Sequence, residues 1–339
     1  MLNRREFVTA SSAAALGALM SRDLLAQPRK DVGSSGGGRA VTLFEWKPIA
    51  PDLASIKVAF GQGGNVTLID GKEVAYLIDT KNSPWGKTLR REASPGAPKL
   101  VVINTHHHAD HTGGNHAFTG DCDVLAHEKC LPRIEGNVAR YISQIKEAVG
   151  NFPKGESEGL KRAREDWTEL YHNVTKLEAK NFTPTEAVKD THEIATPGGA
   201  KISLRHFGPG HTDNDLVLHL PNSNVLIVGD LVFRKVFPYV DQNGGGTIEG
   251  WISALKQAQA LCDKKTRVVP GHGDLCGPEG IADQITYFEK CRDAVAKAIK
   301  AGRQRKDIVT MKLPFHGYAN EDRQSMTMIQ LYAELSEKK

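Results

Sequence analysis

Histidine and aspartate side chains are concentrated in one short stretch with the pattern His106-x-His108-x-Asp110-His111, which two glycines follow. On an extended segment successive side chains point to opposite sides, so His106 and His108 point the same way. His107 then points away and is not expected to be a ligand. Imidazole nitrogens and carboxylate oxygens are ligands that suit zinc. The stretch therefore predicts a metal site.

Three further residues of the same chemical types follow later in the chain. His211 lies in a Gly-Pro-Gly-His-Thr segment, Asp230 follows Val-Gly, and His272 lies in Pro-Gly-His-Gly. Each comes just after a run of apolar residues that reads as a strand. Loops at strand ends commonly carry functional groups, so these side chains are candidates for the same site.

The elements that must position these residues form two strand-rich blocks. Strands are predicted at residues 41–46, 56–60, 66–69, 74–78, 100–103 and 124–127, and again at 202–206, 216–220, 225–228 and 268–269. Apolar residues at steps of three and four predict helices within 160–177, 248–261 and 281–299. Residues 131–190 are interpreted as a helical insertion between the blocks. Two strand blocks with interspersed helices indicate an α/β layer fold.

From residue 41 to about 275 the chain resembles the metallo-β-lactamase superfamily of hydrolases, because every ligand position of that family is filled in order. The resemblance implies a four-layer αβ/βα sandwich with two metal ions at one edge of the sheets. It also implies two Zn²⁺ ions per chain, with iron or manganese as alternatives. The implied first-ion ligands are His106, His108 and His211, the second-ion ligands are Asp110, His111 and His272, the bridging ligand is Asp230, and the buried acid that orients a ligand is Asp79.

The expected chemistry is hydrolysis. Two divalent ions that share a water lower its pKa toward about 7, so that a bridging hydroxide can attack a carbonyl carbon. Asp110 is the expected catalytic residue, which orients the nucleophile and passes its proton to the leaving group. The best-known β-lactamases have Cys or Ser where this chain has Asp230, so the site looks more like the glyoxalase II, lactonase and general-hydrolase branches. Candidate substrates are a lactam, a lactone, a thioester or another ester.

Two other functions remain open from the sequence. One is an iron-dependent oxidoreductase similar to the sulfur dioxygenases, which share the first histidine motif but hold one iron. The other is a non-catalytic periplasmic accessory protein. Lys235 and Tyr239, which follow Asp230 together with Arg234, are candidates for binding a substrate carboxylate or oxyanion; a solvated loop is the equal alternative.

The first 26 residues have the pattern of an export signal. Arg4-Arg5 precedes an apolar, alanine-rich stretch from Val8 to Met20 that is too short to span a bilayer, and a small residue, Ala26, follows it. The paired arginines resemble a twin-arginine signal, which predicts a periplasmic protein without a stable membrane anchor after cleavage. Residues 27–40 are rich in Gly and Ser and are interpreted as a linker. Residues 41–310 then form the catalytic domain and 311–339 a helical tail.

The net charge and the aromatic content limit the classes of partner that the protein can be expected to bind. A formal net charge of +4 with 6% aromatic residues offers little for binding nucleic acid, so a small-molecule substrate is expected. The sequence carries no signal for an oligomeric state. Five cysteines in 339 residues do not make a disulfide scaffold, although Cys262 and Cys276 could form one bridge. The remaining histidines near predicted elements are expected to be packing or surface residues: His116, His127, His206 and His219.

Overall fold

The computed structural model describes residues 43–152, 154–197 and 199–336. The predicted signal and linker, residues 1–26 and 27–40, lie outside the described residues. Within the described ranges, none of the helices has the length and apolar character needed to cross a membrane.

Seven strands form the first sheet, in the order of the sequence. The first four strands are antiparallel, and the pairs from β4 to β7 are parallel. The strands are β1 (Glu45–Pro48), β2 (Ile56–Phe60), β3 (Val66–Ile69), β4 (Val74–Ile78), β5 (Lys99–Ile103), β6 (Asp123–His127) and β7 (Glu186–Val188).

Five strands form the second sheet, in the order β12-β11-β10-β9-β8. All neighbours are antiparallel except β11 and β12, which run parallel. The strands are β8 (Thr191–Ala195), β9 (Lys201–Arg205), β10 (Val217–Leu220), β11 (Val225–Phe233) and β12 (Arg267–His272).

The two sheets pack face to face, and β5 shows how the sequence produces this arrangement. Val101 and Ile103 contribute to the apolar core between the sheets, together with Ile227 of β11. Val102 points the other way, into a second core beneath the helices. A strand that is apolar on both faces is typical of a buried parallel strand, which confirms the prediction for residues 100–103.

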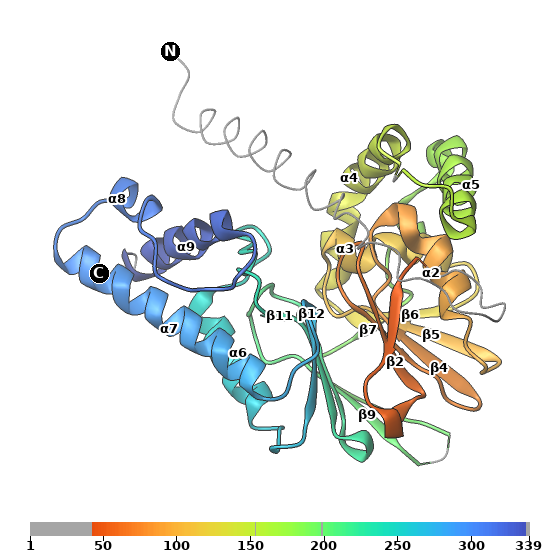
Figure 1. The fold of residues 1–339 in the computed structure, drawn as a ribbon, viewed down its shortest axis with the longest axis horizontal. Helices are drawn as coiled ribbons and strands as arrows, with labels where there is room; N and C mark the ends of the chain where they lie inside the picture. The colour runs from red at the N-terminus through yellow and green to blue at the C-terminus, as the bar shows by residue number, and fades with distance from the viewer. Residues whose placement is uncertain (1–42, 153, 198, 337–339) are drawn as a thin grey trace.

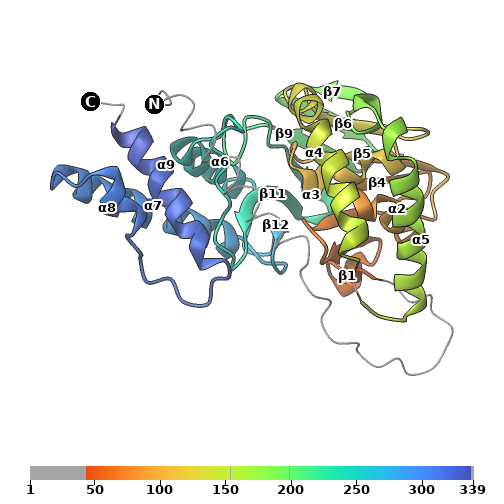
Figure 2. The same ribbon diagram turned by 90° about the horizontal axis from the view of Figure 1, so that it is seen from above.

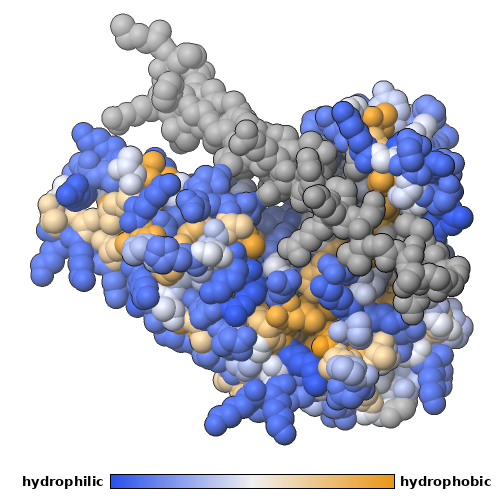
Figure 3. All heavy atoms as spheres, in the orientation of Figure 1, coloured by the Kyte–Doolittle hydropathy of each residue, from blue (hydrophilic) through white to orange (hydrophobic). Residues whose placement is uncertain are grey.

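Helices cover the outer face of each sheet (Figures 1 and 2). Helices α2, α4 and α5 cover the first sheet, whereas α6 and α7 cover the second, and α9 packs against α6 and α7. The surface view is mostly hydrophilic over both helical layers, as amphipathic helices require (Figure 3). The helices are α2 (Gly86–Ala93), α3 (Ala109–Thr112), α4 (Cys130–Gly150), α5 (Glu158–His172), α6 (Ile248–Gln259), α7 (Glu279–Lys300), α8 (Arg305–Val309) and α9 (Gln324–Ser336). The predicted four-layer αβ/βα sandwich is therefore confirmed.

Short 3-10 helices connect several of these elements. They are η1 (Pro51–Leu53), η2 (Ser83–Trp85), η3 (Gly113–Ala117), η4 (Val174–Lys176), η5 (Ala179–Asn181), η6 (Pro221–Ser223) and η7 (Glu321–Arg323).

The segment predicted as a helical insertion, residues 131–190, is helical only in its first part. It contains α4, α5 and two short 3-10 helices, but residues 186–188 form β7. Strand β8 also had no prediction. Both strands lie at sheet edges, where they need little buried apolar surface: Val188 is the one buried residue of β7, and β8 has none.

In the described part of the predicted C-terminal tail, residues 311–336, the helical elements are the short η7 and α9. Met328 and Leu331 of α9 are fully buried in the same core as Tyr287 of α7. The tail therefore packs against the catalytic domain. Cys262 and Cys276, predicted as a possible disulfide, are free thiols. Their sulfurs lie near two different backbone carbonyls, those of Ala258 and Val268.

Candidate metal centre

All the candidate ligands lie on segments that reach one edge of the sandwich. Figure 2 shows α3, β11 and β12 in the middle of the molecule, between the two helical layers. His106 and His108 follow the end of β5, Asp230 lies within β11 and His272 ends β12. Strand ends from both sheets therefore meet there.

The first group consists of three histidines and one aspartate whose ligand atoms all lie within 4.8 Å of one another: His106, His108, His211 and Asp230. His211 Nε2 is 2.9 Å from His108 Nδ1. Asp230 Oδ2 lies 3.4 Å from His211 Nε2 and 3.7 Å from His106 Nε2. These four side chains face a common point.

The second group consists of Asp110, His111 and His272, and it adjoins the first through Asp230. His272 Nε2 is 3.2 Å from Asp110 Oδ2 and 3.4 Å from Asp230 Oδ2. His111 Nε2 is 3.1 Å from Asp230 Oδ1. Asp230 therefore contacts histidines of both groups. We call the seven residues the central cluster.

The spacing of these atoms suits metal coordination. Zn–N and Zn–O bonds of about 2.0–2.1 Å in a tetrahedron place two ligand atoms about 3.3 Å apart, and the distances above run from 2.9 to 3.7 Å. Besides His211 Nδ1, three buried atoms of the cluster have no hydrogen-bond partner: His106 Nε2, His111 Nε2 and Asp230 Oδ1, which face other ligand atoms. Buried polar atoms normally have one, so these atoms fit a bound cation.

Asp79 orients two of the histidines, as the resemblance implies for one. Its carboxylate accepts hydrogen bonds from the Thr105 amide (2.7 Å), the Thr105 hydroxyl (2.8 Å) and His111 Nδ1 (2.7 Å). Because the Thr105 hydroxyl donates to Asp79, its oxygen accepts from His106 Nδ1 at 3.0 Å. Protons on both Nδ1 atoms leave both Nε2 lone pairs directed at the cluster.

Asp241 orients His108 in the way that Asp79 orients His111. The sequence analysis did not identify Asp241 as a residue of the site. Its Oδ2 lies 2.9 Å from His108 Nε2, so the Nε2 proton is donated to the carboxylate. The Nδ1 lone pair of His108 then faces His211. The signal was weak, because Asp241 follows Asp230 by eleven residues in a loop.

Electrostatics divides the central cluster into two halves. Burial disfavours charge on His111, yet the carboxylates of Asp230 and Asp110 raise its pKa well above the usual value. The pKa of His272 is likewise raised to about 9, against burial, by Asp230. Burial instead lowers the pKa of His106 well below its usual value. His111 and His272 therefore favour the positively charged form, whereas His106 favours the neutral imidazole.

Two glycines allow the close approach of backbone to the cluster. A Cβ on Gly64 would lie 2.2 Å from the His111 ring, and one on Gly271 would lie 1.9 Å from Asp230 Oδ1. Asn65 joins these segments. Its backbone amide donates to the Gly271 carbonyl at 2.7 Å, and its side-chain amide donates to the Pro270 carbonyl at 2.9 Å. The loop after β2 is thereby tied to the segment that carries His272.

Lys81 holds the same loop, the one that follows β2, through hydrogen bonds. Its side chain is fully buried and donates to the carbonyls of Gly64 (2.6 Å) and Ala59 (3.0 Å). Burial lowers the pKa of Lys81 to about 7, although the charge of Asp110 opposes that shift. The sequence interpretation assigned no role to Lys81, because a lysine is normally a surface residue.

The two candidate substrate-binding residues lie differently. The ring of Tyr239 is 5.8 Å from that of His108, edge to face, so Tyr239 borders the central cluster. Lys235 directs its ammonium to Asp283 (3.7 Å) and to the ring of Tyr318. Arg234 also pairs with Asp283. The contacts recorded for Lys235 are therefore with α7 and the C-terminal segment, not with the cluster.

Of four histidines outside the central cluster, two make separate contacts and two lie side by side. His107 lies outside the central cluster: its Nδ1 accepts from the Asn214 side-chain amide at 2.9 Å, and its Nε2 lies 3.8 Å from Asp241 Oδ2. His116 Nε2 lies 2.7 Å from the Ser83 carbonyl, which is a packing role. His127 and His206, expected to be packing or surface residues, instead lie together, with ring centroids 4.3 Å apart.

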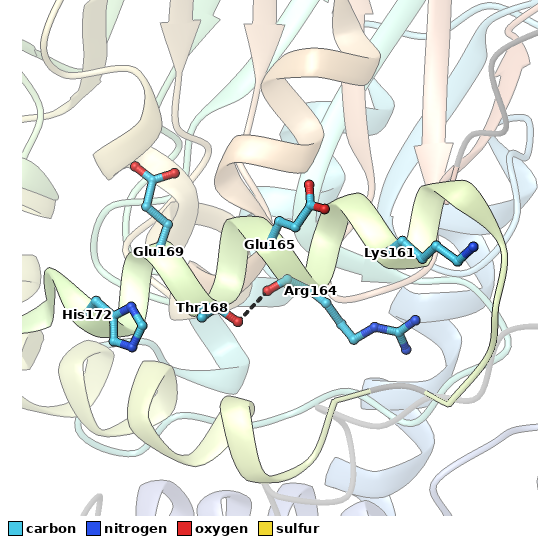
Figure 4. Close-up of a pocket in the computed structure, with 6 residues that line it drawn as sticks. All are labelled: Lys161, Arg164, Glu165, Thr168, Glu169 and His172. Carbon is cyan, nitrogen blue, oxygen red and sulfur yellow. Dashed lines mark hydrogen bonds between the residues drawn. The ribbon is translucent and has the colours of Figure 1, made fainter.

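A hollow along α5 lies apart from the central cluster (Figure 4). Six residues of that helix line it: Lys161, Arg164, Glu165, Thr168, Glu169 and His172. All are polar, and the Thr168 hydroxyl donates to the Arg164 carbonyl of its own helix. The hollow is a solvated helix face, and none of its residues belongs to the cluster.

Comparison with known proteins agrees with this geometry. A family model described as the metallo-beta-lactamase superfamily matches residues 59–128 and 131–272. The human acyl-coenzyme A thioesterase MBLAC2 is 23% identical over 258 residues, which cover 70% of this chain and 85% of that protein. A linear primary-alkylsulfatase from a Pseudomonas strain is 25% identical over 242 residues, 68% of this chain and 44% of the sulfatase. The chain thus spans less than half the length of that sulfatase.

Solved structures show the same fold. A sec-alkylsulfatase from Pseudomonas aligns with a TM-score of 0.56 at 17% identity, over 83% of this chain and 49% of the sulfatase. A metallo-beta-lactamase from Pontibacter korlensis aligns with a TM-score of 0.50 at 19% identity, over 72% of this chain and 97% of the lactamase.

Proposed function

Because the chain belongs to the metallo-β-lactamase superfamily and is a metal-dependent hydrolase, we propose that it is a dinuclear zinc enzyme that hydrolyses an ester bond. The observation that carries the proposal is the position of Asp230. Its two oxygens lie within 3.7 Å of histidines from both ligand groups. A carboxylate so placed can bridge two ions.

The proposed ligand roles follow the two groups. His106, His108 and His211 hold one ion. Asp110, His111 and His272 hold the other, with Asp230 between them. Bound divalent ions lower the pKa of a coordinated water toward about 7 and polarise the bond under attack.

The chain's own residues then orient the reaction. The Asp110 side chain is 29% exposed, against 3% for Asp230. Asp110 is therefore the carboxylate of the two that a substrate can reach. In this proposal Asp110 accepts a proton from the nucleophile and passes it to the leaving group, while Tyr239 borders the substrate beside His108.

The first substrate class to test is an acyl thioester. The thioesterase relative matches this chain over most of both lengths, whereas the alkylsulfatase matches over less than half of its own. An alkyl sulfate ester is the second candidate, because both a sequence relative and a structural neighbour are sulfatases. Lactones and β-lactams complete the panel.

The test combines metal analysis with that panel of substrates. The purified enzyme, dialysed against a weak chelator, is expected to retain two zinc ions per chain and to hydrolyse one substrate class. Asp110→Asn is expected to remove most activity and to stay folded, whereas Asp121→Asn, at an exposed carboxylate paired with Arg90, keeps it. Wild-type rates in Asp110→Asn would refute its role. One iron per chain, with oxygen uptake on a persulfide, would replace the hydrolase by a sulfur dioxygenase.

We also propose that the protein is exported to the periplasm after it has folded and taken up metal. The support is the Arg4-Arg5 pair ahead of an apolar stretch. Replacing both arginines by lysine is expected to retain the protein inside the cell, as measured by fractionation. Normal export of that variant would contradict the assignment.

A further inference from the structure

A second cluster of ligand-type side chains lies at the junction of the two sheets. His127 ends β6 of the first sheet, His206 directly follows β9 of the second, and Asp190 lies in the connection from β7 to β8. Their ligand atoms all lie within 4.8 Å of one another. We propose that this peripheral cluster binds a divalent transition metal ion of the kind that prefers imidazole, such as Zn²⁺, independently of the central cluster.

The distances between these side chains suit such an ion. His127 Nε2 lies 3.2 Å from Asp190 Oδ1, close to the separation of about 3.3 Å expected for two ligands on tetrahedral zinc. The ring centroids of His127 and His206 are 4.3 Å apart, slightly closer than the 4.7–5.0 Å between the three histidines assigned to the first central ion. Two imidazoles and one carboxylate leave a fourth position for water.

The tautomer of His206 is already suited to binding. Its Nδ1 lies 2.9 Å from the Asp215 carbonyl oxygen, so Nδ1 carries the proton and donates it there. The Nε2 lone pair is then available to a metal. Metal-bound histidines usually donate their other nitrogen to a carbonyl or a carboxylate in this way.

Backbone contacts hold the three segments in place before any ion binds. The His206 amide donates to the Asp190 carbonyl at 2.8 Å, and the Glu128 amide donates to the Val188 carbonyl at 2.9 Å. These bonds join both sheets to the connection between them. An ion bound here would cross-link the two sheets and stabilise the folded chain.

Burial and charge agree with this assignment. The His127 side chain is fully buried, and burial lowers its pKa, so its imidazole is neutral at pH 7. The hydrogen bond from His127 lowers the pKa of Asp190, so that carboxylate is ionised. The long contact from the Lys129 amide to His127 Nδ1, 3.4 Å, must be given up when Nε2 binds a metal. We therefore expect micromolar rather than nanomolar affinity.

The experiment measures zinc per chain by equilibrium dialysis against a series of buffered free Zn²⁺ concentrations. The wild-type chain is expected to bind one more ion at micromolar free zinc than it retains against a weak chelator. Asp190→Asn and His206→Gln are expected to weaken that step by more than about tenfold, since even outer-shell changes cost 10- to 100-fold in metal affinity. His192→Gln, at a partly exposed histidine of the neighbouring strand β8, is the matched control and retains it.

Asp190 is exposed, so Asp190→Asn should fold normally, and unchanged hydrolytic activity would show that the central cluster is intact. The proposal is overturned if the wild-type chain shows no additional binding step. It is also overturned if Asp190→Asn or His206→Gln leaves the zinc affinity of that step unchanged, or if His192→Gln abolishes the step. Because activity reports the central cluster and the additional step reports the peripheral one, the two proposals fail separately.

Discussion

The central and peripheral clusters combine the same two chemical groups, imidazole and carboxylate, but the protein surrounds them differently. In the central cluster the Asp230 side chain is 3% exposed, whereas in the peripheral cluster the Asp190 side chain is 76% exposed. Asp79 and Asp241 orient central histidines through their carboxylates. The peripheral His206 is oriented by one backbone carbonyl.

The difference separates a site that can perform chemistry from one that can only bind. Charges buried away from water interact strongly, because the local dielectric is low. A cluster with two carboxylates of its own and carboxylate support behind it can hold two cations and stabilise charge that develops on a substrate. The peripheral cluster has one carboxylate, and that carboxylate is largely exposed to water, so the expected role of the cluster is structural.

The largest expected effect comes from the carboxylate between the two groups. Asp230→Asn should lower kcat/KM by about 10³-fold or more, because metal ions supply several kcal/mol of transition-state stabilisation. The same substitution in the peripheral cluster, Asp190→Asn, should leave kcat/KM unchanged. Steady-state kinetics on both variants tests the contrast. Equal losses would remove the distinction between the clusters.

Asp79→Asn should have the next largest effect. An asparagine cannot accept every hydrogen bond that Asp79 receives from Thr105 and His111. Metal affinity should fall about 10- to 100-fold, and raising the metal concentration should restore part of the activity. Chelator competition measures the affinity. A variant that binds metal as tightly as the wild type would show that orientation of His111 does not matter.

Asp241→Asn should act in the same direction with a smaller effect, about tenfold at limiting metal. Within the central cluster, the described contact of Asp241 is with His108, and the Asp241 side chain is 17% exposed, against 2% for Asp79. Water can therefore replace part of the lost hydrogen bond. Activity measured as a function of metal concentration in both variants shows which of the two substitutions has the larger effect. A larger loss than in Asp79→Asn would contradict it.

His206→Gln should change kcat/KM by less than about twofold. One route from His206 to the central cluster runs through Asp215, whose carboxylate accepts from the Thr212 amide at 2.8 Å beside His211. The hydrogen bond from His206 is to the Asp215 backbone, not to that carboxylate. A tenfold loss of kcat/KM in a folded variant would show that the two clusters are coupled along this route.

A change in pH-dependent stability, rather than in activity, is expected at His116, which belongs to neither cluster. Burial lowers its pKa to about 4, against about 6.5 in the unfolded chain. Between these values the unfolded chain binds a proton that the native chain does not, so the free energy of unfolding falls as the pH drops from 6.5 to 4. His116→Gln should reduce that slope by up to about 1.4 kcal/mol per pH unit.

Urea unfolding of the metal-free protein at several pH values in this range measures the slope. His192→Gln, at a histidine with no part in either cluster, serves as the control. An unchanged slope in His116→Gln would mean that His116 is protonated in the native state.

Much of the fold was predictable because local sequence determines strands and amphipathic helices. Strands β2, β3 and β4 begin and end at the predicted residues, since alternation and turn residues mark their ends. Strands β7 and β8 were missed because edge strands need little apolar surface. The partial exposure of β8 makes its pattern polar, so neighbouring strands, rather than its own residues, determine its conformation.

The sequence by itself determined which residue types are available and how His106 and His108 are directed, because side-chain direction along an extended segment is a local property. Only the tertiary structure decided which distant side chains meet. The approach of Asp241 to His108, of Asn65 to Gly271 and of His127 to His206 depends on how two sheets pack. Such contacts join residues more than 75 positions apart, and no local pattern encodes the packing of one sheet on another.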